Sequence, residues 1–166
     1  MAKTTNIKCI NVVGFSDVGK TTVLRRLALL INDNTTWLSD SVLLSNKYKF
    51  AVILEGDTVP IIKRHFCILK REKIDYILCT SHTGDTLEHI YSELVNLGLF
   101  KNNIDAKNST LLVFKESDCK HCNSIAICSN LPKKERAPHC MSHNDAFVTK
   151  LKDLVSLHFG VEFKNE

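Results

Sequence analysis

The sequence predicts an α/β domain in which a mostly parallel β-sheet lies between layers of helices. Short apolar segments typical of buried strands alternate with segments in which apolar residues recur every three or four positions, as on one face of a helix. A loop that begins with glycine separates the first such strand from the first such helix. The length of 166 residues fits a single domain, residues 1–166, with a substantial core.

The loop at residues 14–21 fits the phosphate-binding motif G-x-x-x-x-G-K-[ST]. An apolar strand precedes it, and a helix follows in which Leu24, Leu27, Ala28 and Ile31 share one face. Strand, loop and helix therefore stand in the order that this motif requires. The positive end of the helix macrodipole adds to the attraction for phosphate.

Each residue type in this motif has a physical role. Gly14 and Gly19 let the backbone curl so that successive N–H groups point at phosphate oxygens. Lys20 reaches the β- and γ-phosphates, and the Thr21 hydroxyl is a ligand for Mg²⁺. The predicted phosphate-binding residues are Gly14, Ser16, Asp17, Val18, Gly19, Lys20, Thr21 and Thr22.

The next segments predict a loop and an edge hairpin. The polar, turn-rich stretch at residues 32–40 is expected to be a surface loop. Strand candidates at 42–44 and 48–54 are so close in sequence that they predict an antiparallel hairpin, because a parallel pair needs a longer crossover. Asp57 or Thr58 is expected to cap the following helix.

The second half of the chain continues the alternation. Residues 74–79 and 110–114 predict buried strands, and residues 101–108 predict a polar connection before the second of them. Ligands of parallel sheets bind at the carboxyl ends of the strands. The loops that follow the strands are therefore expected around one site; they begin after Val13, Leu54, Cys79 and Phe114.

The helices of the second half have recognisable ends. Asp85 with Glu88 predicts a capping box, and Gly98 suits the end of that helix. Gly160 is expected to end the last helix. The apolar face predicted for that helix consists of Phe147, Leu151, Leu154 and Leu157. The loop before the first of these two helices contains His82, which we interpret as a solvated loop histidine on the ligand side.

Composition narrows the class of protein. The net charge of +4 is small and the basic residues are scattered, so no nucleic-acid partner is expected. No apolar run approaches the ~18 residues of a membrane span, and residues 1–6 do not resemble a signal peptide. The sequence therefore predicts no intrinsic membrane anchor. Seven cysteines without an export signal indicate a reducing compartment and a cytoplasmic location.

Four stretches resemble the Ras-like small GTPases, and they are most similar to the ADP-ribosylation-factor branch. GFSDVGKTTVLRRL at residues 14–27 resembles that branch's GLDxxGKTTxLxxL. CTSHTGDTLEHIYSELVNL at 79–97 is similar to its VDSxDxxRxxEAxxEL segment. TLLVF at 110–114 resembles the strand before the guanine-recognition motif. HCMSHNDAFVTKLKDL at 139–154 resembles TCATSGDGLxEGLxWL, the base-closing loop with the final helix.

The resemblance implies a guanine-nucleotide-binding domain with GTP or GDP and Mg²⁺ as cofactors and with protein partners. The family's N-K-x-D motif falls at residues 115–118, where Asp118 would accept the donors of the guanine edge beside Lys115. The loop that closes over the base would contribute Cys140, Met141 and Ser142. The implied magnesium residues are Thr21, a switch threonine at Thr35 or Thr36, and Glu55 or Asp57.

The family's D-x-x-G motif has no clear counterpart at residues 54–60. Thr58 or Pro60 occupies the glycine position, and proline has no N–H with which to sense a phosphate. The glutamine that positions the attacking water in this family is not adjacent in either register. The expected function is therefore a switch or pseudo-GTPase that acts through partner binding, with weak or absent hydrolysis.

A second pattern predicts an alternative function, an ATP-dependent kinase or NTPase with a zinc-stapled lid at residues 119–143. Cys119-x2-Cys122 and Cys140-x2-His143 have the ligand types and paired spacing of a structural zinc site. Basic residues of the lid would reach phosphates; they are Lys133, Lys134 and Arg136. On the sequence, both functions stay open.

Overall fold

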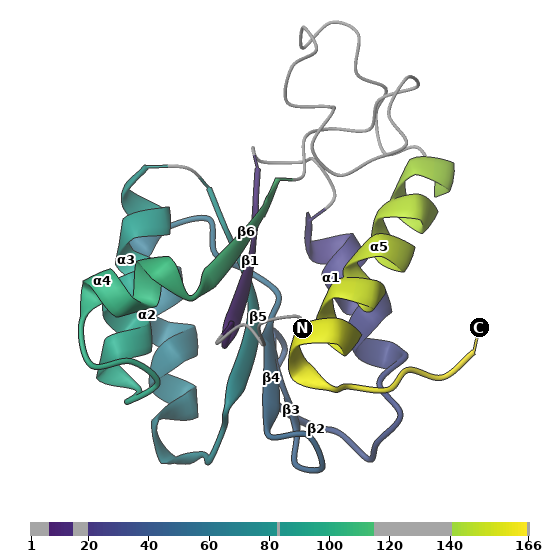
Figure 1. Ribbon diagram of the computed structural model, residues 1–166, viewed down its shortest axis with the longest axis horizontal. Helices are drawn as coiled ribbons and strands as arrows, with labels where there is room; N and C mark the ends of the chain where they lie inside the picture. The colour runs from purple at the N-terminus through teal and green to yellow at the C-terminus, as the bar shows by residue number, and fades with distance from the viewer. Residues whose placement is uncertain (1–6, 15–19, 83, 115–140, 166) are drawn as a thin grey trace, which may run out of the picture.

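The computed structural model describes residues 7–14, 20–82, 84–114 and 141–165, which form an α/β domain (Figure 1). Its strands are β1 (Cys9–Val13), β2 (Thr36–Ser39), β3 (Val42–Ser45), β4 (Phe50–Ile53), β5 (Tyr76–Ser81) and β6 (Thr110–Phe114). Its helices are α1 (Lys20–Leu29), α2 (Val59–Ile68), α3 (Asp85–Asn96), α4 (Asn103–Asn108) and α5 (Met141–Phe159), with a 3-10 turn at Leu69–Arg71.

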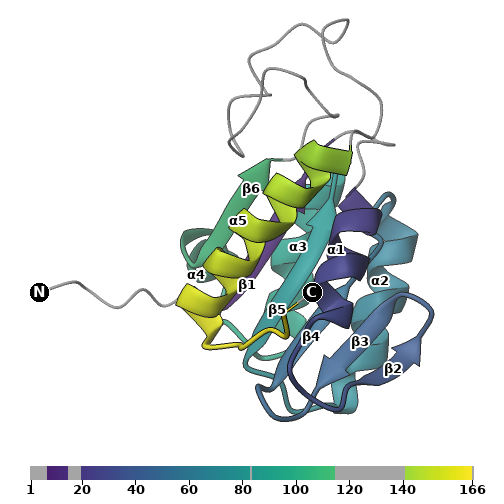
Figure 2. The ribbon, with the colours of Figure 1, turned by 90° about the vertical axis from the view of Figure 1, so that its right-hand side faces the viewer.

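The strands form one six-stranded sheet in the order β2-β3-β4-β5-β1-β6. β4, β5, β1 and β6 are mutually parallel, whereas β2 pairs antiparallel with β3 and β3 pairs antiparallel with β4. The mostly parallel sheet and the antiparallel hairpin predicted at β3 and β4 are therefore confirmed, but the hairpin does not form the edge of the sheet, because β2 lies outside it (Figure 2). Because the parallel strands point the same way, their carboxyl ends lie along one edge of the sheet.

Helices cover both faces of the sheet, so the domain has three layers (Figure 1). α1 and α5 lie together on one face, and α2, α3 and α4 lie on the other. Each face has its own cluster of buried apolar side chains. Among the described residues, no helix is both long enough and apolar enough to cross a bilayer.

The inner faces of α1 and α5 show where helical periodicity is reliable. The predicted stripe of α1 is buried, from Leu24 through Leu27 to Ile31 just after the helix. In α5 the prediction is partly wrong, because the side chain of Leu157 is 76 % exposed. Val155 and Phe159 complete the buried face of α5 by continuing the four-residue step from Phe147 and Leu151, and Val148 is buried beside them.

Two elements lie where polar connections were predicted. β2 occupies part of the stretch predicted to be a surface loop, and it forms the edge of the sheet. α4 begins after Asn102, whose side chain accepts a hydrogen bond from the Asp105 N–H at 2.9 Å. α4 buries only Ala106 completely, so apolar periodicity could not reveal it.

Helix ends follow local chemistry. Thr58 caps α2 by accepting a hydrogen bond from the N–H of Ile61, as predicted for this segment. The capping box predicted at Asp85 is wrong, because Gly84 is the N-cap of α3 and has no side chain to donate or accept. Gly84 has φ +80 with ψ −133, a conformation that residues with a Cβ rarely adopt.

His65, on α2, makes a further feature of the core. The side chain is buried, and neither ring nitrogen has a hydrogen-bond partner among the described residues. Burial lowers the pKa of His65 from its ordinary value of 6.5, with Arg64 acting in the same direction and Glu55 opposing them. The folded protein therefore binds the His65 proton less readily than the unfolded chain does.

We expect the free energy of unfolding to fall as the pH drops from 7.5 to 5.5, because the unfolded state takes up the proton first. His65→Leu should remove this part of the pH dependence and raise stability at pH 7.5 by roughly 1 kcal/mol, since it removes unpaired buried polar atoms. Urea unfolding of both proteins at the two pH values measures this. An equal loss of stability in both proteins at low pH would contradict the assignment.

Candidate functional site

The candidate site lies between the carboxyl ends of β1 and β5, where the path of the chain reverses. From β1 the chain crosses through α1 to β2 at the far edge of the sheet, returns through β3 and β4 to β5, and then passes β1 to reach β6. Parallel crossovers are right-handed, so opposite directions of travel put the connecting helices on opposite faces. α1 and α3 do follow these neighbouring strands on opposite faces (Figure 1). A switch point of this kind is the ordinary ligand position in an open α/β sheet.

Lys20 lies at this crevice as the first residue of α1, with only 5 % of its side chain area exposed. Its Nζ donates a hydrogen bond to the Gly14 carbonyl at 2.7 Å. The Gly14 N–H in turn donates to the Ser81 carbonyl of β5 at 3.2 Å. The two ends of the predicted phosphate loop are therefore joined to each other and to β5, with the ammonium group at the mouth of the loop.

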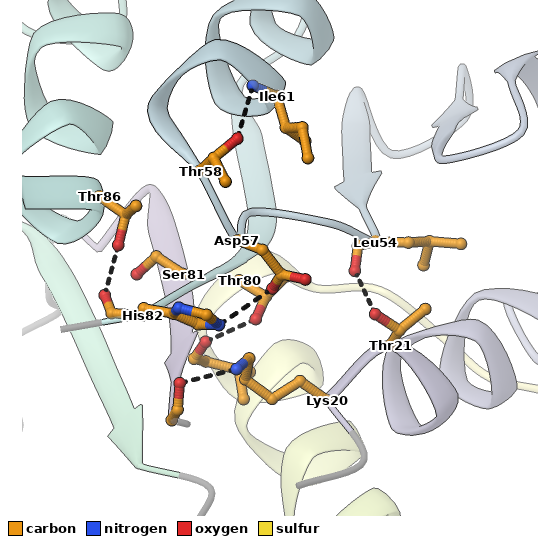
Figure 3. Close-up of polar contacts among 12 residues, drawn as sticks. Lys20, Thr21, Leu54, Asp57, Thr58, Ile61, Thr80, Ser81, His82 and Thr86 are labelled. Atoms are coloured by element: carbon orange, nitrogen blue, oxygen red, sulfur yellow. Dashed lines mark hydrogen bonds and ion pairs between the residues drawn. The ribbon is translucent and has the colours of Figure 1, made fainter. Parts of the chain in front are cut away.

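The Thr21 hydroxyl donates a hydrogen bond to the Leu54 carbonyl at 2.9 Å (Figure 3). A hydroxyl has one proton and two lone pairs, so this bond uses the donor and leaves the lone pairs for a metal. The donor chemistry of Thr21 therefore fits the predicted magnesium role. Thr22, the next residue of α1, is exposed. The other predicted phosphate-binding residues, Ser16, Asp17, Val18 and Gly19, lie outside the described residues.

The loop after β4 packs tightly against β5. A Cβ placed on Gly56 would lie 1.8 Å from the Thr80 carbonyl oxygen, so only glycine fits this approach. The following residue, Asp57, reaches across to β5's loop, where its Oδ1 lies 3.2 Å from Nε2 of His82. Figure 3 shows the side chains of Asp57 and His82 facing each other, whereas the ammonium of Lys20 points to the Gly14 carbonyl.

Glu55 and Asp57 were predicted as alternative magnesium acids, and the structure separates them. Glu55 accepts a hydrogen bond from the Ser41 hydroxyl at 3.0 Å, which ties it to the start of the hairpin. Asp57 faces His82 at the crevice. Asp57 is therefore the better placed of the two carboxylates for a cation that is bound beside Thr21.

His82 was interpreted as a solvated loop histidine, but only 27 % of its side chain is exposed and it pairs with Asp57. Its carbonyl accepts a hydrogen bond from the Thr86 hydroxyl at 2.9 Å. The preceding residue, Ser81, is tied through its hydroxyl to the buried Asn11 amide at 3.0 Å. The only sequence signal that His82 would lie at the crevice was its position in a loop after a predicted buried strand.

Thr36 is not brought to this site. It begins β2, and the pairing of the strands puts it level with Cys9, the first residue of β1. The residues paired in turn across the sheet from β2 to β1 are Thr36, Leu44, Ala51, Ile77 and Cys9. Three strands lie between β2 and β1, which at strand spacing corresponds to about 19 Å. The crevice is at the opposite end of β1. The magnesium role predicted for Thr36 therefore has no geometric support.

Most of the predicted base-binding and zinc residues lie outside the described residues; they are Lys115, Asp118, Cys119, Cys122 and Cys140. Met141, Ser142 and His143 belong to the first turn of α5, which begins at Met141. Within the described ranges, no cluster of three or more histidine, cysteine, aspartate or glutamate side chains is arranged to hold a metal ion. The zinc site stays a prediction from the sequence.

Comparisons with protein-family models, with curated proteins and with solved structures found no match to this chain. The small-GTPase resemblance therefore stays a prediction.

Proposed function

We propose that this protein binds a nucleoside di- or triphosphate with Mg²⁺ at the crevice between β1 and β5. The observation that carries the proposal is the position of Lys20 and Thr21, which meet the switch point of the sheet at the start of α1. A buried ammonium and a hydroxyl whose lone pairs are available supply the groups that phosphate and Mg²⁺ require.

The proposed magnesium ligands are the Thr21 hydroxyl and the nucleotide phosphates, with Asp57 as the nearby acid. Mg²⁺ keeps several waters and uses one or two protein oxygens together with substrate phosphates. One hydroxyl and one carboxylate are therefore sufficient. The metal would offset the repulsion between the phosphates and the carboxylate of Asp57.

We propose guanine nucleotides as the ligands and a protein partner as the output, with weak or absent hydrolysis. The chain contains no glutamine at any position, so the usual water-positioning side chain of small GTPases is missing. Asp118 carries the guanine preference in this proposal. Function would then depend on which nucleotide is bound, in a cytoplasmic switch or pseudo-GTPase.

Calorimetric titration of the nucleotide-free protein with GTP, GDP and ATP in Mg²⁺ tests the proposal. We expect GTP and GDP to bind more tightly than ATP, and Asp118→Ala to reduce that preference by about tenfold, because one pair of charge-assisted hydrogen bonds is lost. ATP preference with one bound zinc per chain would support the lidded kinase instead. No binding of any of the three nucleotides would overturn the proposal.

A further inference from the structure

The pair formed by Asp57 and His82 joins two loops that would flank a bound phosphate chain. Asp57 follows β4 and His82 follows β5, with Oδ1 and Nε2 3.2 Å apart. The Lys20 side chain, whose Nζ donates to the Gly14 carbonyl, is drawn with them in Figure 3. A carboxylate and an imidazole therefore meet beside the groups that we propose to bind phosphate and Mg²⁺.

The backbone next to each partner is held by hydrogen bonds or close packing. The His82 carbonyl accepts a hydrogen bond from the Thr86 hydroxyl. The carbonyl of the preceding residue, Ser81, accepts one from the N–H of Gly14, which directly follows β1. Asp57 lies between Gly56, which packs on the Thr80 carbonyl, and the cap residue of α2. The side chains can change partners while their backbones stay in place.

The pair itself contributes little to the stability of the fold. The side chain of Asp57 is 55 % exposed and that of His82 is 27 % exposed, and ion pairs of this kind are weak because water screens them. Exchanging this contact for another charged contact therefore has a low free-energy cost. The matched interaction in α3, between His89 and Glu93 at 2.7 Å, lies within one helix and joins no loops.

Resting on the proposed function, we propose that Asp57 and His82 distinguish nucleoside triphosphates from diphosphates by exchanging partners. A terminal phosphate accepts the hydrogen bond of the His82 imidazole in place of Asp57, and the carboxylate turns to the solvent shell of the Mg²⁺ ion. In the exchange, the His82 imidazole and the Asp57 carboxylate each gain a new hydrogen-bonding partner in place of the other. A diphosphate has no terminal phosphate to accept that hydrogen bond, so the pair stays closed.

The exchange has a structural consequence at α2. Asp57 immediately precedes Thr58, the cap of that helix, so the change of partner turns a charged side chain at the start of α2. The two nucleotide states would then differ at the start of one helix on the surface. A protein partner could therefore distinguish the two nucleotide states at the start of α2, although residues 54–60 depart from the D-x-x-G motif.

The test compares affinities for a non-hydrolysable GTP analogue and for GDP in the wild type, His82→Gln and Asp57→Asn. We expect His82→Gln to weaken the analogue about tenfold and to change GDP affinity less than twofold, because only the terminal phosphate loses a hydrogen bond. Asp57→Asn should raise the Mg²⁺ concentration that the analogue requires. His89→Gln and Glu93→Gln serve as matched controls and should change neither affinity.

A spectroscopic readout separates this role from a structural one. The imidazole NMR signals of His82, identified by their loss in His82→Gln, should shift with the GTP analogue and not with GDP. Equal changes in the affinities for both nucleotides, or unchanged signals, would overturn the exchange while leaving nucleotide binding intact. A wild-type protein that binds neither nucleotide would overturn the proposed function and this inference together.

Discussion

Lys20→Ala is expected to weaken nucleotide binding by at least about 100-fold, equal to about 3 kcal/mol. The ammonium is buried beside the Gly14 carbonyl, so hydrogen bonds to a phosphate bound there, as we propose, would form in a region that excludes much of the water. Each charge-assisted hydrogen bond contributes about 1.5–3 kcal/mol, and the lysine can make two to the phosphate chain. Calorimetry with GTP and GDP in Mg²⁺ measures the loss.

The matched control for this variant is Lys70→Ala. Lys70 is exposed in the 3-10 turn after α2, so it carries the same charge without a role at the crevice. Its replacement should leave both affinities within twofold of the wild type. If Lys20→Ala and Lys70→Ala weakened binding equally, the effect of Lys20 would be one of net charge, and the predicted phosphate loop would lose its main support.

The sequence predicted the architecture well wherever a segment buries a continuous apolar face. β1, β5 and β6 are short apolar segments, and the face of α1 from Leu24 to Leu27 repeats at helical spacing. The antiparallel pairing of β3 with β4 followed from the few residues between them, because a parallel connection does not fit that length. These predictions depend on the spacing of apolar residues and on the lengths of the connections between strands, both of which can be counted in the sequence.

The sequence was a poorer guide wherever pairing across the sheet decides the outcome. β2 is an exposed or half-buried edge strand, and it is a strand because it pairs with β3, which the pattern of its own four residues does not show. The resemblance implied a magnesium role for Thr35 or Thr36, yet the register puts Thr36 at the far end of the sheet from the crevice. Asp57 and His82 are 25 positions apart, and no spacing rule connects a loop after β4 to a loop after β5.

Gly56→Ala is expected to destabilise the fold by about 3 kcal/mol, because the added methyl group would overlap the Thr80 carbonyl oxygen. The atoms that the methyl group would meet belong to the backbone of Thr80 and Ser81, so they cannot turn away as a flexible side chain can. The loop after β4 or β5 itself must shift. Urea unfolding of the variant and the wild type measures the loss of stability.

Gly160→Ala provides the matched comparison, since it adds the same methyl group at a residue with open space around it. Its φ of +69 is unfavourable for alanine, so we expect a cost of about 1 kcal/mol with nucleotide affinity unchanged. Gly56→Ala should instead also weaken nucleotide binding, because the shifted loop carries the Leu54 carbonyl that holds Thr21 and the Asp57 that faces His82. Equal stability losses in the two variants would show that the chain accommodates the methyl group at Gly56. A stability loss without weaker binding would show that the loop after β4 does not belong to the site.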